Sequence, residues 1–229
     1  MNKAFKDIRA VVFDMAGTTI DEGDIVYQSV KNALRLFGFE FSLDQVTLEI
    51  GGMSKREGIE KLLNEYYPGR SSEILVAKIF NAFIHGLEER YTTDTSIVEM
   101  PGASALFTWL KSEGIKVALN TGYSRSTVDI LVNRMNWSQK NLIDFTIASD
   151  EVERGRPEPF MINEITSVFE IEPANIAKVG DTISDINEGH NAGCAVVVGI
   201  TSPKYDRDAL LGIGATHTIE HLSELKALF

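Results

Sequence analysis

Six short apolar segments recur along the chain and alternate with segments of helical periodicity. Each has the length and composition of a buried β-strand. They occupy residues 11–13, 116–119, 145–148, 176–179, 195–198 and 217–219. The helical patterns between and after them cover residues 103–113, 124–136, 157–169, 185–192 and 222–228. Strands that alternate with helices predict an α/β fold built on a doubly wound parallel sheet.

The alternation is missing between about residue 24 and residue 95. This stretch contains only helical patterns, at residues 25–37, 43–50, 55–66 and 72–91. A helical block inserted after the first strand of a sheet predicts a second, all-helical domain that caps the first. The expected division is a core of residues 1–22 and 95–229 and a cap of residues 23–94.

The net charge of the chain limits the kinds of partner that it is expected to bind. Its 33 acidic and 22 basic residues give a net charge of −11, which argues against nucleic acid and anionic membranes as partners. No apolar stretch approaches the ~18 residues of a membrane helix, and the first residues lack the apolar region of a signal peptide. The single cysteine, Cys194, excludes an internal disulfide. These features predict a cytoplasmic protein.

The segment of residues 14–19 (Asp-Met-Ala-Gly-Thr-Thr) follows the first apolar strand directly. An aspartate at the carboxyl end of such a strand lies where α/β sheets carry their chemistry. Gly17 permits a tight turn, and Thr18 offers a hydroxyl and an N–H group to an anion. Asp14 is therefore the candidate nucleophile, although an aspartate that only caps the turn is a common alternative.

Two further segments end apolar strands with polar residues. Thr121 and Gly122 close the second strand, and a threonine followed by glycine can present its hydroxyl and N–H groups to phosphate. Asp181 and Asp185 follow the fourth strand in the segment Gly-Asp-Thr-Ile-Ser-Asp. Magnesium prefers hard oxygen ligands, so Asp14, Asp181 and Asp185 predict a Mg²⁺ site. The backbone carbonyl of Ala16 can add a ligand that its side chain cannot.

The order and spacing of these segments resemble the haloacid dehalogenase (HAD) superfamily, with its Rossmann-like core. Its phosphatases carry Asp-x-Asp-Gly-Thr, whereas Asp-x-Ala-Gly-Thr-Thr is similar to its phosphonatase branch, as are residues 121–123 (Thr-Gly-Tyr) and 155–157 (Gly-Arg-Pro). The resemblance implies an aspartyl-phosphate on Asp14, phosphoryl binding by the Thr18 and Thr121 segments, and a fixed cation at Arg156.

Ala16 stands where those phosphatases have a second carboxylate that protonates the leaving group. Phosphonatases instead use a cap lysine that forms an iminium with an aldehyde substrate. By its position relative to Gly52, Lys55 matches that lysine, although a solvated helix lysine is the alternative. Three departures weaken the match. Met15 replaces a tryptophan of the family pattern, Gly51 replaces a methionine and Gly58 replaces a histidine.

The sequence thus predicts a Mg²⁺-dependent, phosphonatase-like hydrolase of a small phosphonate or phosphate metabolite, with Lys55 as catalytic and substrate-binding residue. Two alternatives stay open: a phosphomonoesterase that lacks the usual second aspartate, and a binding protein that has lost turnover. A homodimer through the cap is a further expectation. Its candidate residues serve equally well as the cap's own core: Ile25, Val26, Val30, Leu34 and Phe37.

Overall fold

The computed structural model describes residues 5–50 and 54–229. The chain forms two compact units: Met1–Asp21 together with Ile97–Phe229, and Glu22–Ser96. The second unit is a single insertion into the chain of the first. The first unit carries the sheet and the second is helical throughout its described residues.

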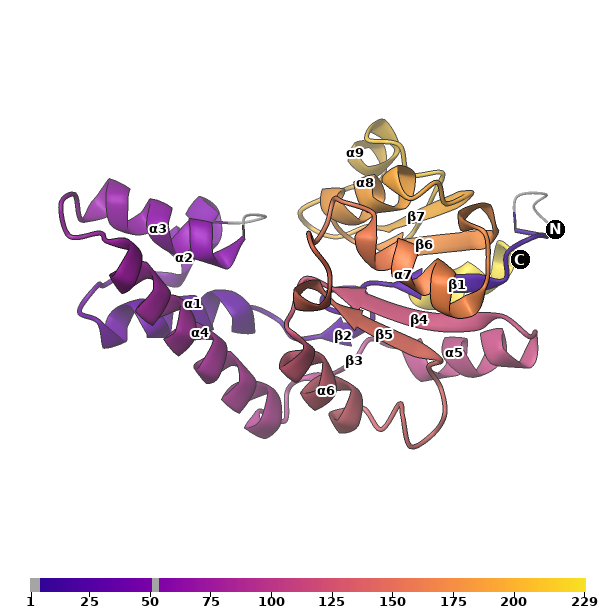
Figure 1. The fold of residues 1–229 in the computed structure, drawn as a ribbon, viewed down its shortest axis with the longest axis horizontal. Coiled ribbons are helices and arrows are strands. Elements are labelled where there is room, and N and C mark those ends of the chain that lie inside the picture. The colour runs from indigo at the N-terminus through magenta and orange to yellow at the C-terminus, as the bar shows by residue number, and fades with distance from the viewer. Residues whose placement is uncertain (1–4, 51–53) are drawn as a thin grey trace. The chain divides into compact units, whose positions relative to one another are not determined.

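The first unit is built on a six-stranded parallel sheet in the order β5-β4-β1-β6-β7-β8 (Figure 1). The strands are β1 (Ala10–Phe13), β4 (Lys116–Thr121), β5 (Phe145–Ala148), β6 (Ile176–Gly180), β7 (Val196–Ile200) and β8 (His217–Ile219). All five pairings are parallel. The predicted α/β class is confirmed.

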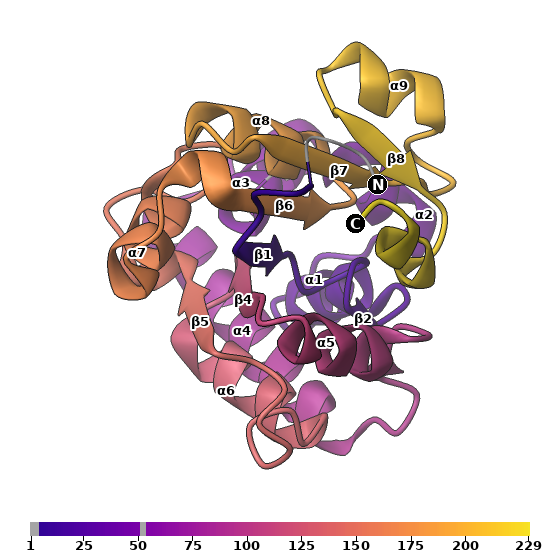
Figure 2. The same ribbon diagram turned by 90° about the vertical axis from the view of Figure 1, so that its right-hand side faces the viewer.

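Helices cover both faces of this sheet (Figure 2). Right-handed crossovers place α5 and α6 on one face and α7, α8 and α9 on the other, because the chain runs outward from β1 to β5 and then returns to β6. The bounds are α5 (Ala103–Ser112), α6 (Arg125–Arg134), α7 (Phe160–Phe169), α8 (Ile183–Asn191) and α9 (Arg207–Gly212). The strand order therefore reverses between β1 and β6, and ligands of such sheets bind at the carboxyl ends of the strands at that point.

The centre of the sheet explains why its strands read as continuous apolar runs. All four residues of β1 are fully buried, because the strand has a hydrogen-bonded neighbour on each side and helices over both faces. Phe13 packs against Phe107 of α5 with ring centroids 5.3 Å apart, and Phe107 packs edge-on against Trp137. These contacts fix the end of β1, where the site begins.

Three short elements were not predicted. Strands β2 (Ile20–Asp21) and β3 (Val98–Glu99) pair antiparallel, one just before the second unit in the chain and one just after it. Two-residue strands and the six-residue helix α9 are too short to give a periodic signal. The last helical segment, residues 222–227, is a 3₁₀-helix that packs against α5.

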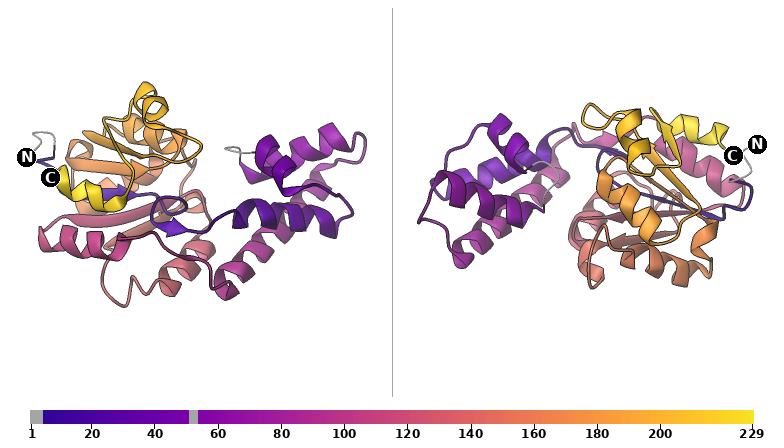
Figure 3. Two further views of the ribbon diagram at one scale, coloured as in Figure 1. Left: turned by 180° about the vertical axis from the view of Figure 1, so that it is seen from behind. Right: turned by 90° about the horizontal axis from the view of Figure 1, so that it is seen from above.

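The second unit contains α1 (Ile25–Leu36), α2 (Leu43–Ile50), α3 (Lys55–Tyr66) and α4 (Glu73–Thr93). These helices pack on one another, with α1 against α4 and α2 against α3, as the indigo and purple ribbons of Figure 3 show. Ser54 and Ser72 cap α3 and α4, each accepting a hydrogen bond from a backbone N–H of the first turn.

Close packing within this unit explains one departure from the family pattern. A Cβ atom at Gly58 of α3 would lie 2.7 Å from Cβ of Ile50 in α2. The glycine therefore lets the two helices approach, and a larger side chain there would push Ile50 aside. Gly51 and Gly52, the other glycines of this segment, lie outside the described residues.

The apolar face of α1 is used inside the unit. Ile25, Val26, Val30 and Leu34 are buried, while Phe37 is half-buried. They build the core of the helical unit, so an interface between two copies of the chain through this unit would need other residues. No helix in the described part of the chain is long and apolar enough to span a membrane.

Candidate active site

Asp14 extends the central strand by one residue. Its N–H donates to the carbonyl of Val179 at 2.9 Å, which continues the pairing of β1 with β6 beyond Phe13. The side chain of Asp14 is only 6% exposed. The strand ladder therefore delivers a buried carboxylate to the carboxyl edge of the sheet, at the position where its order reverses.

A tight turn follows Asp14. The carbonyl of Met15 accepts hydrogen bonds from the N–H groups of Thr18, Thr19 and Ile20. Gly17 has φ +76°, and a Cβ atom there would lie 2.6 Å from Oδ2 of Asp181. Only glycine meets both demands. In the described part of the chain, these hydrogen bonds of the turn end on Met15 and not on the carbonyl oxygen of Ala16.

Two threonine hydroxyls of this turn contact the site. Thr18 Oγ1 donates to Oδ1 of Asp181 at 3.1 Å, and Thr19 Oγ1 donates to the backbone carbonyl of Asp14 at 2.9 Å. Both side chains are buried. Thr19 thus holds the backbone of the candidate nucleophile, and Thr18 ties the turn after β1 to the end of β6.

Arg156 precedes α7 and reaches across the end of the sheet. Its Nη2 donates to Oδ1 of Asp14 at 2.5 Å, and its Nη1 donates to Oδ1 of Asp185. Its side chain is 10% exposed. The planar guanidinium binds two carboxylates with separate N–H groups, a geometry that lysine could not reproduce.

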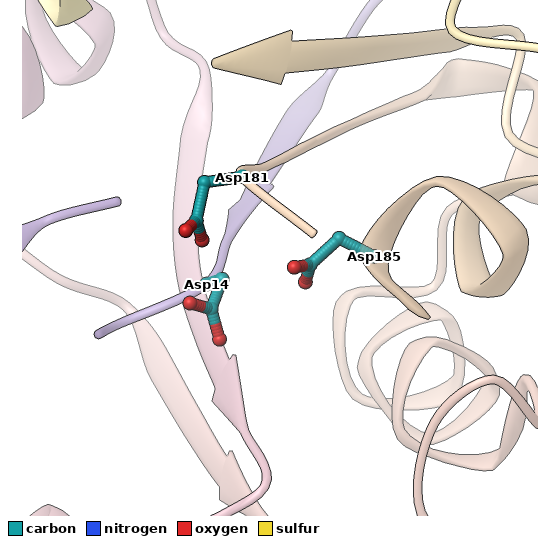
Figure 4. Close-up of side chains that lie close together, drawn as sticks. All are labelled: Asp14, Asp181 and Asp185. Atoms are coloured by element: carbon teal, nitrogen blue, oxygen red, sulfur yellow. The ribbon is translucent and has the colours of Figure 1, made fainter. Parts of the chain in front are cut away.

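Asp181 and Asp185 come from the end of β6 and the start of α8. Thr182 caps that helix: its hydroxyl and backbone N–H both bond to Oδ2 of Asp185. A Cβ atom at Gly180 would lie 2.3 Å from the Asp185 side chain, so the glycine makes room for it. Figure 4 shows that the side chains of Asp14, Asp181 and Asp185 lie close together.

This convergence suits a divalent cation. Asp14, Asp181 and Asp185 each offer an oxygen, and the three oxygens lie within 4.8 Å of one another. Hard oxygen ligands at such distances are what Mg²⁺ takes. Both Asp185 oxygens already accept hydrogen bonds, from Arg156, Lys178 and Thr182, so Asp14 and Asp181 are the more available pair.

The three carboxyl groups differ in how far the nearby cations offset the effect of burial on their pKa values. Burial raises the pKa of Asp14 to about 6, and the partial relief given by Arg156 does not cancel it. Burial and the neighbouring Asp14 raise the pKa of Asp181 to about 7. Burial acts on Asp185 too, but Arg156 and Lys178 outweigh it and lower its pKa. A cation between Asp14 and Asp181 would favour both ionised forms.

The second strand of the site is β4. Thr121 ends it and is buried, and its Oγ1 accepts a hydrogen bond from the N–H of Tyr123 at 3.3 Å. Gly122 follows, exposed, with its carbonyl bonded by the hydroxyl of Ser149. Because β4 pairs directly with β1, both residues lie at the same sheet edge as Asp14.

Lys55 lies in the helical unit, at the first position of α3. Its side chain is half-buried, and its Nζ lies 5.0 Å from the centroid of the Tyr27 ring in α1. A cation over an aromatic face is stabilised in its charged form. The remaining site residues predicted from the sequence belong to the other unit, so the catalytic role of Lys55 stays a prediction.

Sequence reasoning missed three buried residues behind the site: Asn120, Lys178 and Glu188. All three are fully buried. Lys178 Nζ contacts Oδ1 of Asn120, Oδ1 of Asp185 and Oε2 of Glu188 at 2.6, 3.0 and 3.1 Å. The sequence does contain a signal that could have revealed them: a lysine in the middle of an otherwise apolar strand that is expected to be buried.

The chain belongs to the haloacid dehalogenase-like hydrolases. The model of that family matches residues 11–198, which include the Asp14 turn, Thr121, Arg156 and the Asp181–Asp185 segment. The recognition of this superfamily from its motifs, and of the chain as a hydrolase, is confirmed.

Within that family the chain is similar to phosphonoacetaldehyde hydrolases. It is 31% identical to the one of Latilactobacillus sakei subsp. sakei (strain 23K), over 97% of this chain and 95% of the relative. It is 30% identical to the one of Bacillus cytotoxicus, over 81% of this chain and 73% of the relative. The resemblance to the phosphonatase branch is therefore confirmed.

Solved structures support the fold. A predicted phosphoglycolate phosphatase from Haemophilus somnus 129pt matches with a TM-score of 0.84 at 18% identity, covering 97% of this chain and 98% of that one. A phosphonoacetaldehyde hydrolase-like protein from Oleispira antarctica matches with a TM-score of 0.80 at 23% identity, covering 98% and 92%. The two bear different functional names at similar likeness, so the fold does not choose between them.

Proposed function

We propose that this protein is a Mg²⁺-dependent hydrolase that transfers the phosphoryl group of a small phosphonate or phosphate metabolite to Asp14 and then to water. One observation carries the proposal. The buried Asp14 carboxylate, held by Arg156 at 2.5 Å, lies in a cluster of three carboxylates that can share a divalent cation. The similarity to phosphonoacetaldehyde hydrolases supports a phosphonatase-like reaction.

The proposed metal ligands are the carboxylates of Asp14 and Asp181 and the backbone carbonyl of Ala16. Asp185, whose oxygens are engaged by cations and by Thr182, would act mainly by orienting this set. When bound, Mg²⁺ supplies positive charge that screens the phosphoryl oxygens from the attacking carboxylate.

Asp14 then performs two steps. Arg156 engages Oδ1, so Oδ2 is the oxygen that attacks phosphorus in line. A P–O bond to Asp14 forms as the bond to the leaving group breaks, and the leaving group takes the bonding electron pair. Water then attacks the aspartyl-phosphate, inorganic phosphate leaves and the Asp14 carboxylate is restored. Thr18, Thr121 and the N–H of Gly122 would hold the phosphoryl oxygens.

Ala16 constrains the leaving group. Its methyl group cannot donate a proton, so the chemistry favours a leaving group that needs none at that position. A carbanion next to a carbonyl or an iminium meets this condition, because the electron pair is delocalised onto oxygen or nitrogen. A β-carbonyl phosphonate is the substrate class with that property, and Lys55 would supply the iminium.

A second candidate, a phosphomonoesterase, is favoured by the surroundings of Lys55. The Tyr27 ring at 5.0 Å stabilises the ammonium form, whereas an imine needs the neutral amine. At Gly58 no side chain is present to shuttle the protons of imine formation, and Ile50 fills the space nearby. In this case Lys55 would contribute its charge alone.

One assay decides between the candidates. Phosphate release is measured with Mg²⁺ from phosphonoacetaldehyde and from a panel of phosphate monoesters, with borohydride trapping and mass spectrometry of the modified residue. A trapped adduct on Lys55, absent in Lys55→Arg and kept in Lys61→Met on the same helix, establishes P–C cleavage through an imine. Ester hydrolysis without an adduct, abolished in Asp14→Asn, establishes the phosphatase. No release from any compound contradicts both.

A further inference from the structure

Behind the Asp14 cluster lies a second layer of charge that is sealed from solvent. Lys178 projects from β6 and Glu188 from α8, and both side chains are completely buried. Asn120 of β4, also buried, lies between them. Isolated charges at such depth are strongly disfavoured, so this layer needs a reason beyond filling space.

The polar groups of this layer are paired with one another and with Asp185 of the Asp14 cluster. An ammonium has three N–H donors, and Lys178 has three acceptors within 3.1 Å: Asn120, Asp185 and Glu188. The Asn120 amide accepts from Lys178 with its oxygen and donates to both Glu188 oxygens at 2.8 Å. Every partner therefore fixes another, which gives the layer one geometry.

This layer also surrounds Arg156. Oε2 of Glu188 lies 3.8 Å from Nε of Arg156, and the backbone carbonyl of Asn120 accepts from Nη2 at 3.4 Å. Asp185 contacts both Arg156 and Lys178 through the same oxygen. The guanidinium is thus bounded on its Nε edge by Glu188, on Nη1 by Asp185 and on Nη2 by Asp14.

We propose that Lys178, Asn120 and Glu188 are positioning residues that orient the Arg156 guanidinium and the Asp185 carboxylate, and through them the Asp14 nucleophile. Glu188 holds the inner edge of the guanidinium, so that the outer edge faces Asp14. Lys178 contacts both Asp185 and Glu188, at 3.0 and 3.1 Å, and so holds the two carboxylates side by side. The role in catalysis rests on the proposed function, whereas the orientation of Arg156 does not.

A double substitution separates positioning from stability. Lys178→Met and Glu188→Gln each remove one member of a buried ion pair and leave the other without that partner, so each alone should lower the melting temperature. The double variant K178M/E188Q removes both charges with little change in volume, and replacement of a buried pair in this way is often tolerated. We expect the double variant to regain most of the lost thermal stability while kcat for phosphate release stays at least tenfold below that of the wild-type protein and KM changes less than threefold.

A measurement without turnover tests the same point. The Nε–H signal of Arg156, assigned by its loss in Arg156→Lys, should exchange slowly with solvent in ¹H–¹⁵N spectra of the wild-type protein. In K178M/E188Q it should shift and exchange faster, because the guanidinium loses its inner partner. The NMR measurement tests the orientation of Arg156 even if the wild-type protein releases no phosphate from any probe. That outcome would contradict the proposed function but not the positioning of Arg156.

A matched control uses an ion pair at the other end of the strands. Lys111 Nζ contacts Oδ1 of Asp144 at 2.9 Å, and Asp144 immediately precedes β5. K111M/D144N should change melting temperature without changing kcat or the Arg156 signal. The positioning role is overturned if K178M/E188Q regains wild-type kcat together with its stability, or if its Arg156 signal is unchanged.

Discussion

The sheet unit and the helical unit hold their candidate catalytic residues in opposite ways. Around Asp14 each charged group has at least one fixed partner: Arg156 bridges two aspartates, and Lys178 contacts three acceptors. Lys55 starts a helix, is half-buried with its Nζ 5.0 Å from the Tyr27 ring centroid, and is followed by the exposed residues Arg56 and Glu57. The first arrangement is a network of buried charges that contact one another, whereas the second is a half-buried lysine at the start of a helix.

The difference suits two tasks that the proposed reaction would require. Phosphoryl transfer needs charges that are already oriented before the substrate binds, because reorienting them during the reaction would raise the barrier. Choice of leaving group needs a side chain whose chemistry can change without disturbing that arrangement. We therefore expect substitutions in the sheet unit to affect all substrates alike, and substitutions around Lys55 to change their ranking.

The largest effect is expected at Asp14. Asp14→Asn keeps the shape of the side chain but removes the nucleophilic charge, and kcat should fall about 10⁴-fold on every substrate. The measurement is phosphate release with Mg²⁺, with Asp208→Asn on the exposed helix α9 as the control. A residual rate within tenfold of wild type would remove Asp14 from the chemistry.

The next effect should be selective. Lys55→Arg keeps the positive charge but cannot form an imine, so activity on phosphonoacetaldehyde should fall about 10³-fold, within the range for a group acting at the reacting centre. Activity on phosphate monoesters should change less than tenfold. The ratio of kcat/KM values for the two substrates is the measurement. An equal loss of kcat/KM on phosphonoacetaldehyde and on phosphate monoesters would contradict a separate role of Lys55 in the choice of leaving group.

A pair of glycines tests the turn after β1. Gly17 and Gly102 both have positive φ, +76° and +88°, so alanine strains the backbone at each. Only at Gly17 would the new Cβ atom meet another group, at 2.6 Å from Asp181 Oδ2, while nothing lies within 4 Å at Gly102. Gly17→Ala should lower kcat/KM about 10²-fold, the size of an ~1 Å misplacement.

Gly102→Ala serves as the control for backbone strain. It should lower the melting temperature by a similar amount to Gly17→Ala but leave kcat/KM within twofold. Similar activity in the two variants would mean that the Asp181 carboxylate can move without cost to the reaction.

The smallest effect is a pH dependence of metal binding. The pKa values of Asp14 and Asp181 are raised to about 6 and about 7 without metal. Raised acids bind protons more tightly in the folded state, so the metal-free protein should lose stability as pH rises from about 4 to 7. Mg²⁺ competes with those protons, so its apparent affinity should rise about tenfold from pH 6 to pH 8.

Calorimetric titration of Mg²⁺ at both pH values measures that change. Asp181→Asn removes the acid with the higher pKa and should flatten the dependence. A constant affinity in the wild-type protein would mean that these carboxylates are not the metal ligands.

Much of the architecture could be predicted from local patterns. The apolar runs of β1 and β7 are continuous because both faces of those strands are covered, so their composition alone predicts their burial. The bounds of α2 and α3 agree with the predicted segments 43–50 and 55–66. The strands β2 and β3 were not predicted, because a two-residue segment is too short to show a periodic pattern. Their pairing partner also lies nearly eighty residues away in the chain.

The candidate site, like the fold, could be predicted from the sequence only in part. The sequence by itself determined which chemical groups stand at strand ends, because a strand end, a glycine turn and a helix cap are local features: Asp14, Thr121, Asp181 and Asp185 follow from them. It also determined what is missing, since no fold can restore a carboxylate at Ala16.

Only the tertiary structure decided which groups are partners. Parallel pairing of β4, β1 and β6 brings Asn120, Asp14 and Lys178 within one cluster, although they are more than fifty residues apart in the chain. Arg156 then binds Asp14 across 142 positions. The orientation of a charged group depends on its neighbours in space, and a buried charge requires such partners. No local sequence pattern can specify which residues those partners are.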